Sequence, residues 1–385
     1  MNRKQVALLF LASMIPTTFH ILRPDLVGAD SYYFLNHICG NTGIPFTTEP
    51  LAAILFQFIP CDLILVKILL GFLLFLNTLF VSMTGELFNK KDGWLAGWFC
   101  FISIIWIKIP FEFENDVFAF PLLFLSIYFL FKGVLHSNRE NTLFGLGVLM
   151  ISGLLWRGAV YYIPIFALYS GISLVILFAV IIMYGPAMLT HLLPAPENAL
   201  ESTPFFGAIQ NTLLFPAVLY YYPALIIPMF YFLILAAFEW KLSLHMIPFF
   251  AISLTKFYSK FPELKNEWLK AFAYWLKFGP ALILLIFSAG ILIQFPHQST
   301  FNAIDYAVEM SDGNVMWNDW DLGYWIEYRG GKPMFWGGMH PPKEIESGVV
   351  ITSFGSDCQL LREFSTDKVL ETEIWSFRDL NVYMC

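Results

Sequence analysis

The chain reads Phe111-Glu112-Phe113-Glu114-Asn115-Asp116 between two long apolar runs, residues 94–110 and 117–131. The stretch therefore lies at the mouth of a candidate membrane span, and it carries three carboxylates. A charged side chain at the centre of the hydrocarbon costs about 2.5–3.5 kcal/mol on the membrane-insertion scale. The cluster must therefore face water as a plain loop or hold a cation.

The composition defines the broad class. Of the 385 residues, 58% are hydrophobic, only 13% are charged, and 41 are Phe. This balance excludes a soluble protein and predicts an all-α polytopic membrane protein. The charge is uneven: residues 299–385 carry 14 acids and 6 bases, a net of −8, while the remainder carries 15 acids and 16 bases. We therefore expect a membrane domain over residues 1–298 and a small acidic α/β domain over residues 299–385.

Apolar runs long enough to cross a bilayer, which takes about 20 residues per helix, predict about eleven spans. This count assumes that the block 142–188 crosses three times, with breaks near Arg157-Gly158 and Ser170-Gly171. The run after Arg3 and Lys4 is interpreted as an uncleaved first span, because no small-residue cleavage site follows it. Residues 50–60 are too short to cross and are expected at the interface. The predicted spans are 5–22, 62–84, 94–110, 117–134, the block 142–188, 206–222, 223–239, 242–257 and 278–296.

The orientation follows from Lys and Arg, which concentrate in short inside loops. The basic loops follow the predicted spans at Lys90-Lys91, at Lys132 to Arg139, and at Lys256 to Lys277. With these loops inside, the C-terminal domain is extracytoplasmic. Six acids that were not used to set the orientation also fall on the outer side: Asp30, Glu112, Glu114, Asp116, Glu201 and Asp321.

The acidic motifs each allow a structural and a functional interpretation. Asp30, in Gly28-Ala29-Asp30-Ser31-Tyr32-Tyr33, suits a helix cap. Glu114 and Asp116 suit a helix N-terminus, where the helix dipole favours acids. The alternative for this pair is a site for Mg²⁺ or Mn²⁺, which bind carboxylate oxygens and keep positions open for substrate phosphates. Glu201 lies in the polar loop 184–205, which is either simply solvated or functional.

Cationic and aromatic side chains form a second set of candidates. Lys241 and His245 begin a predicted span on the outer side, against the positive-inside bias, and Arg157 is similar. These side chains either snorkel to the interface or bind an anionic lipid head group. Residues 317–325 combine three Trp with two Asp. Trp and Asp side chains grouped in this way form a recognition surface, or they pack the C-terminal domain against the membrane domain.

The five cysteines show no metal-ligand spacing. Cys358 and Cys385 both lie in the C-terminal region, and they can form a disulfide if that region is extracytoplasmic. An unpaired state remains the alternative.

Taken together, these stretches resemble the catalytic subunit of oligosaccharyltransferase, of the kind found as a single-subunit enzyme in archaea and bacteria. The resemblance runs in order along most of the chain. It includes a first acidic motif, an acid-x-acid motif, a Trp-Gly-Gly-like motif, a mobile-loop glutamate, a segment opening with a phosphate-binding cation, and a WWDYG-like signature. The segments that carry it are Gly28–Tyr33, Phe113–Phe120, Trp156–Gly158, Glu201–Pro204, Leu214–Tyr221, Lys241–Pro248 and Trp320–Trp325.

The resemblance implies a GT-C-like fold and a metal-dependent glycosyltransferase. The donor would be an oligosaccharide on a polyprenyl (dolichyl) phosphate or pyrophosphate, and the acceptor an Asn in Asn-x-Ser/Thr of an extracytoplasmic protein. Asp30, Glu114, Asp116 and Glu201 would hold Mn²⁺ or Mg²⁺, and Asp30 and Glu201 would also hold the acceptor amide. The resemblance implies donor-phosphate contacts from Lys241, His245 and Arg157, and acceptor contacts from Trp320, Asp321, Gly323 and Tyr324.

The chain also departs from the family pattern. Asp319 and Leu322 replace the first Trp and the Tyr of WWDYG, and Lys241 replaces an Arg, losing the planar fork for phosphate. The C-terminal region is short for the family, so accessory subunits are possible partners. The other expected partners are the lipid bilayer, the lipid-linked donor and the acceptor protein or peptide. Nucleic acid is not an expected partner. These departures motivate a second-ranked alternative, a lipid-phosphate-sugar-dependent GT-C glycosyltransferase acting on a glycan or lipid acceptor. A transporter or a non-catalytic scaffold ranks last, because the acids lie at the ends of the predicted spans and no repeat is visible.

Overall fold

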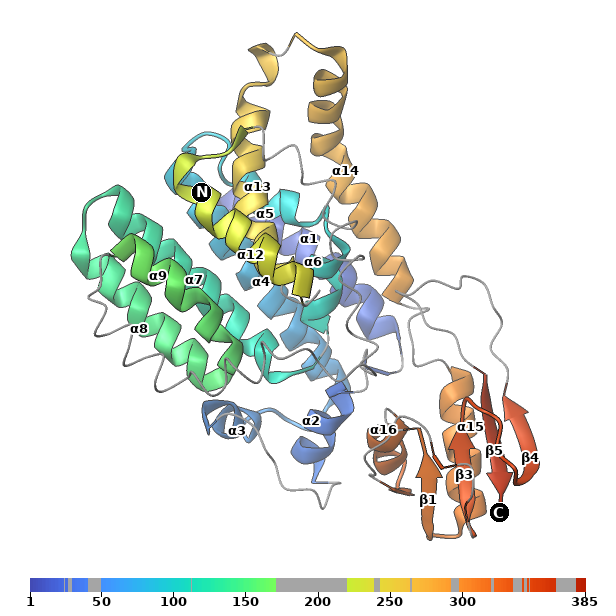
Figure 1. Ribbon diagram of the computed structural model, residues 1–385. Helices are drawn as coiled ribbons and strands as arrows, with labels where there is room; N and C mark the ends of the chain where they lie inside the picture. Colours follow the sequence, from blue (N-terminus) through green and yellow to red (C-terminus); the bar gives the residue numbers. More distant parts are fainter. Residues whose placement is uncertain are drawn as a thin grey trace.

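The computed structural model is a bundle of helices with a small sheet at the C-terminal end (Figure 1). It describes residues 1–23, 25–26, 30–40, 50–111, 113–170, 220–238, 243–263, 265–291, 298–319, 322–334, 341–342, 345, 347–364 and 379–385. Glu112, Glu201, Lys241, Trp320 and Asp321 lie outside these ranges, as does the predicted span 206–222 for nearly all of its length.

In the described part of the chain, four helices are long and apolar enough to cross a membrane. They are α1 (Arg3–Leu22), α4 (Leu63–Phe88), α7 (Asn115–Leu135) and α14 (Glu267–Ile291). Local signals set their starts. Asn2 and Gln5 form a capping box at α1, and the Asp62 carboxylate accepts hydrogen bonds from the backbone N–H groups of Ile64 and Leu65 at α4. The chain is therefore a membrane protein, whereas the count of eleven spans is not confirmed.

Shorter helices complete the bundle. They are α2 (Asp30–Cys39), α3 (Pro50–Phe56), α5 (Leu95–Cys100), α6 (Ile104–Lys108), η1 (Ile109–Phe111), α8 (Arg139–Leu155), η2 (Arg157–Tyr162), α9 (Ile163–Ser170), η4 (Pro223–Leu225), α12 (Ile226–Phe238), α13 (Ser243–Ser259) and η6 (Phe261–Glu263). The break predicted near Arg157-Gly158 is confirmed, because α8 ends at Leu155 and a 3₁₀ segment follows.

Two predicted spans have different boundaries in the structure. The run 94–110 is not one helix, because hydrogen bonds tighten to the i→i−3 pattern from Phe101 to Ser103 and separate α5 from α6. Helix α14 begins at Glu267 instead of residue 278. The Asn266 side chain caps this earlier start by accepting from the backbone N–H groups of Trp268 and Leu269.

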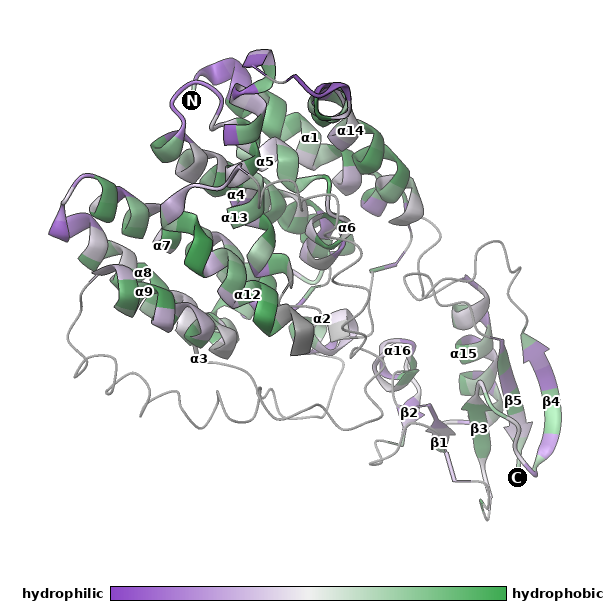
Figure 2. Cartoon of the chain, turned by 45° about the horizontal axis from the view of Figure 1, so that its top comes forward, coloured by the Kyte–Doolittle hydropathy of each residue, from purple (hydrophilic) through white to green (hydrophobic). Residues whose placement is uncertain are grey.

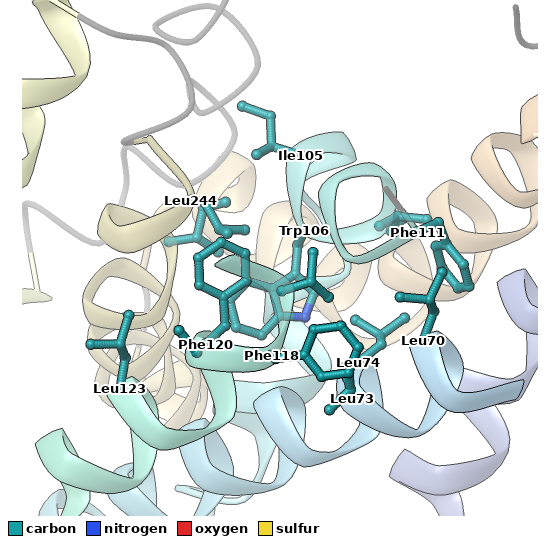
Figure 3. Close-up of a cluster of buried hydrophobic side chains, with 14 of the residues drawn as sticks. Leu70, Leu73, Leu74, Ile105, Trp106, Phe111, Phe118, Phe120, Leu123 and Leu244 are labelled. Carbon is teal, nitrogen blue, oxygen red and sulfur yellow. The ribbon is translucent and has the colours of Figure 1, made fainter. Parts of the chain in front are cut away.

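Helix α4 is central to the bundle and contacts α1, α5 and α7. Its approach to α1 depends on Gly71, since a Cβ there would lie 2.0 Å from the Thr17 hydroxyl oxygen. On its other side, large apolar residues of α4, α6, η1, α7 and α13 form a packed cluster (Figure 3). The Trp106 indole in this cluster donates to the Thr78 hydroxyl at 3.3 Å. Hydrophobic residues run along the helices, and hydrophilic residues gather at the α7–α8 turn (Figure 2).

The C-terminal region has α/β structure, as its sequence predicts. Its sheet has the order β2-β1-β3-β5-β4, with β1 parallel to β2 and β3 and the other pairs antiparallel. Helix α15 (Gln298–Ser311) packs against β3 and contacts β5, β1 and β4. The strands are β1 (Val315–Asn318), β2 (Lys332–Pro333), β3 (Val349–Thr352), β4 (Gln359–Phe364) and β5 (Leu380–Met384), and helix α16 (Gly323–Tyr328) lies between β1 and β2.

Two disulfides tie segments together. Cys358 and Cys385 are bonded, which selects one of the two states that the sequence left open. Cys39 and Cys61 are also bonded, and the sequence did not predict this pair. The Cys39–Cys61 bond joins the end of α2 to the chain just before α4. Cys100 is a buried free thiol.

Candidate functional site

The two acidic motifs meet at a hydrogen bond between segments far apart in the sequence. The backbone N–H of Phe113 donates to the Ser31 hydroxyl oxygen at 2.7 Å. Ser31 follows Asp30 at the start of α2, and Phe113 precedes Glu114 at the start of α7. The Phe113 ring is fully buried among aromatic rings, which fixes the contact: its neighbours are Phe34, Phe56 and Phe118. The backbone of Asp30 therefore lies next to the acid-x-acid motif.

Glu114 and Asp116 both lie at the N-terminus of α7. Glu114 is the N-cap residue, with extended backbone, and Asp116 is in the first turn. The Asp116 side chain is buried, with 8% exposed, whereas Glu114 is half-buried. The helix dipole stabilises negative charge at these positions, so capping and metal binding are compatible roles for the pair.

The donor set suits a hard cation. Carboxylate oxygens are the ligands that Mg²⁺ and Mn²⁺ prefer, and the partly buried Glu114–Asp116 pair offers them next to the start of α2. Within the described residues, no three His, Cys, Asp or Glu side chains lie close enough to share an ion. The side chain of Asp30 and all of Glu201, the other two predicted ligands, lie outside the described part.

A cluster of buried charged side chains lies next to α2, and the sequence analysis did not predict it. Lys67, only 2% exposed, donates from its ammonium group to the Arg23 carbonyl oxygen at 2.5 Å. Arg23 and Asp25 are buried beside it, and burial lowers the pKa of the Arg23 guanidinium and raises that of the Asp25 carboxyl. The available signal was Lys67 itself, since a lysine inside an apolar run is costly unless it has a partner.

His245 lies in an aromatic enclosure with the Trp156 motif. Its Nδ1 is 2.8 Å from the Tyr162 hydroxyl, and its ring stacks on Trp156 at 5.4 Å between centroids. Gly158 is required here, because a Cβ at this position would lie 2.0 Å from the Trp156 ring. The structure thus brings together two of the predicted phosphate-binding segments. For Arg157 only the backbone is described, and Lys241 lies outside the described ranges.

The acceptor-motif segment follows β1. Leu322 and Gly323 are buried and Tyr324 is half-buried, whereas Trp320 and Asp321 lie outside the described residues. Asp319, which replaces a Trp of the family signature, is fully buried. Its carboxylate accepts from the Thr352 hydroxyl at 2.7 Å and from the Ser353 N–H and hydroxyl at 2.8 and 2.9 Å. Asp319 therefore anchors the motif to the end of β3.

Helix α16, which begins within this motif, packs against α2. The Asn36 amide donates to the Tyr324 carbonyl oxygen at 2.9 Å, and the rings of Tyr33 and Tyr324 are 5.2 Å apart. Helix α2 is therefore the common neighbour of the acid-x-acid motif and the acceptor motif.

The fold and these contacts define a class: a polytopic helical membrane protein in which α2 contacts both the start of α7 and helix α16. Comparison with solved structures identifies the fold as that of archaeal oligosaccharyltransferase. The chain is similar to AglB from Archaeoglobus fulgidus in complex with an inhibitory peptide and a dolichol-phosphate, with a TM-score of 0.60 and 12% identity over 86% of this chain and 64% of that one. This likeness confirms the resemblance predicted from the sequence at the level of fold.

Two further structures of the Archaeoglobus fulgidus oligosaccharyltransferase match. One is tethered to an acceptor peptide containing the NVT sequon, with a TM-score of 0.52 and 11% identity over 86% of this chain and 64% of that one. The other is a complex with Zn and sulfate, with a TM-score of 0.53 and 12% identity over 84% and 62%. The chain thus spans less than two thirds of the length of these enzymes. No protein-family model and no curated protein sequence matches the chain.

Proposed function

We propose that this protein is a metal-dependent oligosaccharyltransferase. It transfers an oligosaccharide from a polyprenyl phosphate or pyrophosphate to the Asn side chain of an Asn-x-Ser/Thr sequon, as in N-linked glycosylation. The proposal is supported by the fold shared with archaeal oligosaccharyltransferase, whose solved complexes contain a dolichol-phosphate and a sequon peptide. Residues 1–298 would form the membrane-embedded catalytic domain, and residues 299–385 a separate acceptor-binding domain.

The observation that carries the proposal is the hydrogen bond between Ser31 and Phe113. It links two acidic motifs that are 82 residues apart, at the end of the bundle where the acceptor motif also packs. The bond places the backbone of Asp30 beside Glu114 and Asp116, an arrangement that a cation site built from two distant segments requires.

Each predicted residue then has a chemical task. Glu114 and Asp116, with Asp30 and Glu201, would hold the cation, and Asp30 and Glu201 would also hold the acceptor amide. When bound, Mg²⁺ or Mn²⁺ supplies Lewis-acid neutralisation of the phosphate leaving group. Donor phosphate contacts are assigned to Lys241, His245 and Arg157, and acceptor contacts to Trp320, Asp321, Gly323 and Tyr324.

The proposed site faces the extracytoplasmic side. The positive-inside distribution favours this orientation, and the two disulfides support it, because disulfides persist in oxidising compartments. Cys39 and Cys61 lie at the same end of the helices as the acidic motifs, and Cys358 and Cys385 lie in the C-terminal sheet. An acceptor protein would meet the site after its own translocation.

The test is a transfer assay with membranes, lipid-linked glycan, a sequon peptide and Mn²⁺ or Mg²⁺. We expect glycopeptide from the wild type and at least a hundredfold less from Glu114→Ala or Glu201→Ala. Glu112→Ala is the matched control, because Glu112 lies outside the matched motif, and it should keep wild-type activity. If Glu114→Ala and Glu201→Ala were as active as Glu112→Ala, the assignment of Glu114 and Glu201 to the site would be refuted.

The same assay decides between this function and the alternative. The burial of Asp319 and Leu322, where the family signature has Trp and Tyr, favours an altered acceptor. A product glycosylated on lipid or on glycan but never on peptide would identify the chain as a GT-C glycosyltransferase with such an acceptor.

A further inference from the structure

Helix α2 is held at both of its ends. At its N-terminus, the Ser31 hydroxyl accepts from the backbone of Phe113 beside the acid-x-acid motif. At its C-terminus, Cys39 is disulfide-bonded to Cys61, just before α4. One turn before Cys39, the fully buried Asn36 donates to the Tyr324 carbonyl oxygen at 2.9 Å and to the Glu327 carboxylate at 3.3 Å.

Helix α16 also makes contacts at its far end, where Arg329 is the C-cap residue. The Arg329 guanidinium lies 4.4 Å above the Phe301 ring. It lies 4.0 Å from the Asp25 carboxylate, in the chain just after α1, and 3.7 Å from the Asp305 carboxylate on α15. The Tyr32 ring of α2 packs against Tyr328 at 5.0 Å. The position of α16 relative to α2 is therefore defined at two points.

The length of α2 sets the separation between Asp30 and Asn36. Asp30 and Asn36 are six residues apart, which corresponds to a rise of about 9 Å along an α-helix. An extended acceptor peptide covers about 7 Å between an Asn and the hydroxyl residue two positions later, at 3.3–3.6 Å per residue. The two lengths are similar, so α2 has the length needed to separate a site for the acceptor amide, next to Asp30, from a site for the acceptor hydroxyl, next to α16.

We propose that Asn36 is a positioning residue and that α2 acts as the spacer between the metal-binding and acceptor-binding motifs. Asn36 does not touch the substrate; it fixes the carbonyl of Tyr324 and thereby the first turn of α16. The ligand that this spacing fits is an extended peptide with an amide and a hydroxyl two residues apart. This inference rests on the proposed function and adds the residue that sets the acceptor spacing.

The test compares Asn36→Ala and Asn36→Asp with wild type in full-length protein. Asn36→Asp keeps the side-chain volume but removes the donor and places a carboxylate beside the Tyr324 carbonyl. We expect both variants to raise KM for the peptide at least tenfold and to reduce the preference for Asn-x-Thr over Asn-x-x-Thr peptides. KM for the lipid-linked donor and kcat should stay within about twofold, a separation that a purely structural role would not produce. Asn302→Ala, an exposed Asn that bonds only Gln298 in the described residues, is the control.

Hydrogen exchange separates failure of this inference from failure of the proposed function. The amides of residues 322–329 should exchange at least tenfold faster in Asn36→Ala, with those of β3 and β5 unchanged. If the wild type glycosylates peptide and Asn36→Ala leaves peptide KM and this exchange unchanged, the positioning role is wrong. If the wild type glycosylates no peptide, the proposed function and the role in acceptor spacing both fail. Faster exchange at residues 322–329 in the variant would then show only that Asn36 holds α16 on α2.

Discussion

Asp319→Ala should loosen the contact between β1 and β3 far more than the loss of an exposed acid in the same region. The Asp319 carboxylate is fully buried and accepts three hydrogen bonds from Thr352 and Ser353 at the end of β3. Its backbone continues the link, because the Asp319 N–H donates to the Ile351 carbonyl oxygen at 3.2 Å. The side chain therefore joins β1 to β3 at the point where the acceptor motif begins.

The magnitude follows from these three bonds. A hydrogen bond to a charged group contributes about 1.5–3 kcal/mol, so three would sum to about 4.5–9 kcal/mol. The sum overstates the loss, because the variant no longer buries a carboxylate and the freed hydroxyls can turn to water. We expect a net destabilisation of about 3–5 kcal/mol. At 1.4 kcal/mol per factor of ten, opening of this region should become roughly a hundred to a few thousand times more frequent.

The assay is native-state hydrogen exchange of β3 and β5 in the full-length protein in detergent or nanodiscs. Asp357→Ala, which removes an exposed acid in the same region, is the control and should leave exchange unchanged. Asp319→Asn keeps the shape and one acceptor oxygen, so its effect should be intermediate. Exchange in Asp319→Ala within threefold of wild type would refute the view that this carboxylate is an anchor.

Four further predictions follow from the site. Ser31→Ala leaves the buried Phe113 N–H without its acceptor, so transfer activity should fall about tenfold, whereas Thr18→Ala, at an exposed hydroxyl, should not change it. Reduction of the Cys39–Cys61 disulfide, or its replacement by two Ser, should lower activity and speed proteolysis between α2 and α4. EDTA should abolish transfer, and Mg²⁺ or Mn²⁺ should restore it; full activity in chelator would contradict metal dependence. His245→Ala removes a fully packed ring and should lower the melting temperature, whereas His245→Phe should retain most of the stability but lose the bond to Tyr162.

The sequence predicted the class of protein because membrane burial imposes strong compositional rules. Apolar runs of the correct length, basic inside loops and an acidic C-terminal region need no tertiary information. The order of the motifs likewise indicated the fold, and the structure bears this out. Span boundaries were less well predicted. The hydrogen-bond pattern that divides residues 94–110 and the cap at Asn266 that extends α14 are local features, which average hydropathy does not register.

The sequence by itself thus determined that this is a helical membrane protein with acids at the mouths of its spans and a small α/β region after them. Only the tertiary structure decided which of these residues meet. The contacts of Ser31 with Phe113 and of Asn36 with Tyr324 join residues 82 and 288 positions apart, which no periodicity encodes. In the sequence, Asp319 is only a departure from the WWDYG signature. Its three hydrogen bonds show that it anchors the acceptor motif to the end of β3. The physical reason is general, because hydropathy acts on each residue alone, whereas hydrogen bonds and close packing depend on which segments the fold brings together.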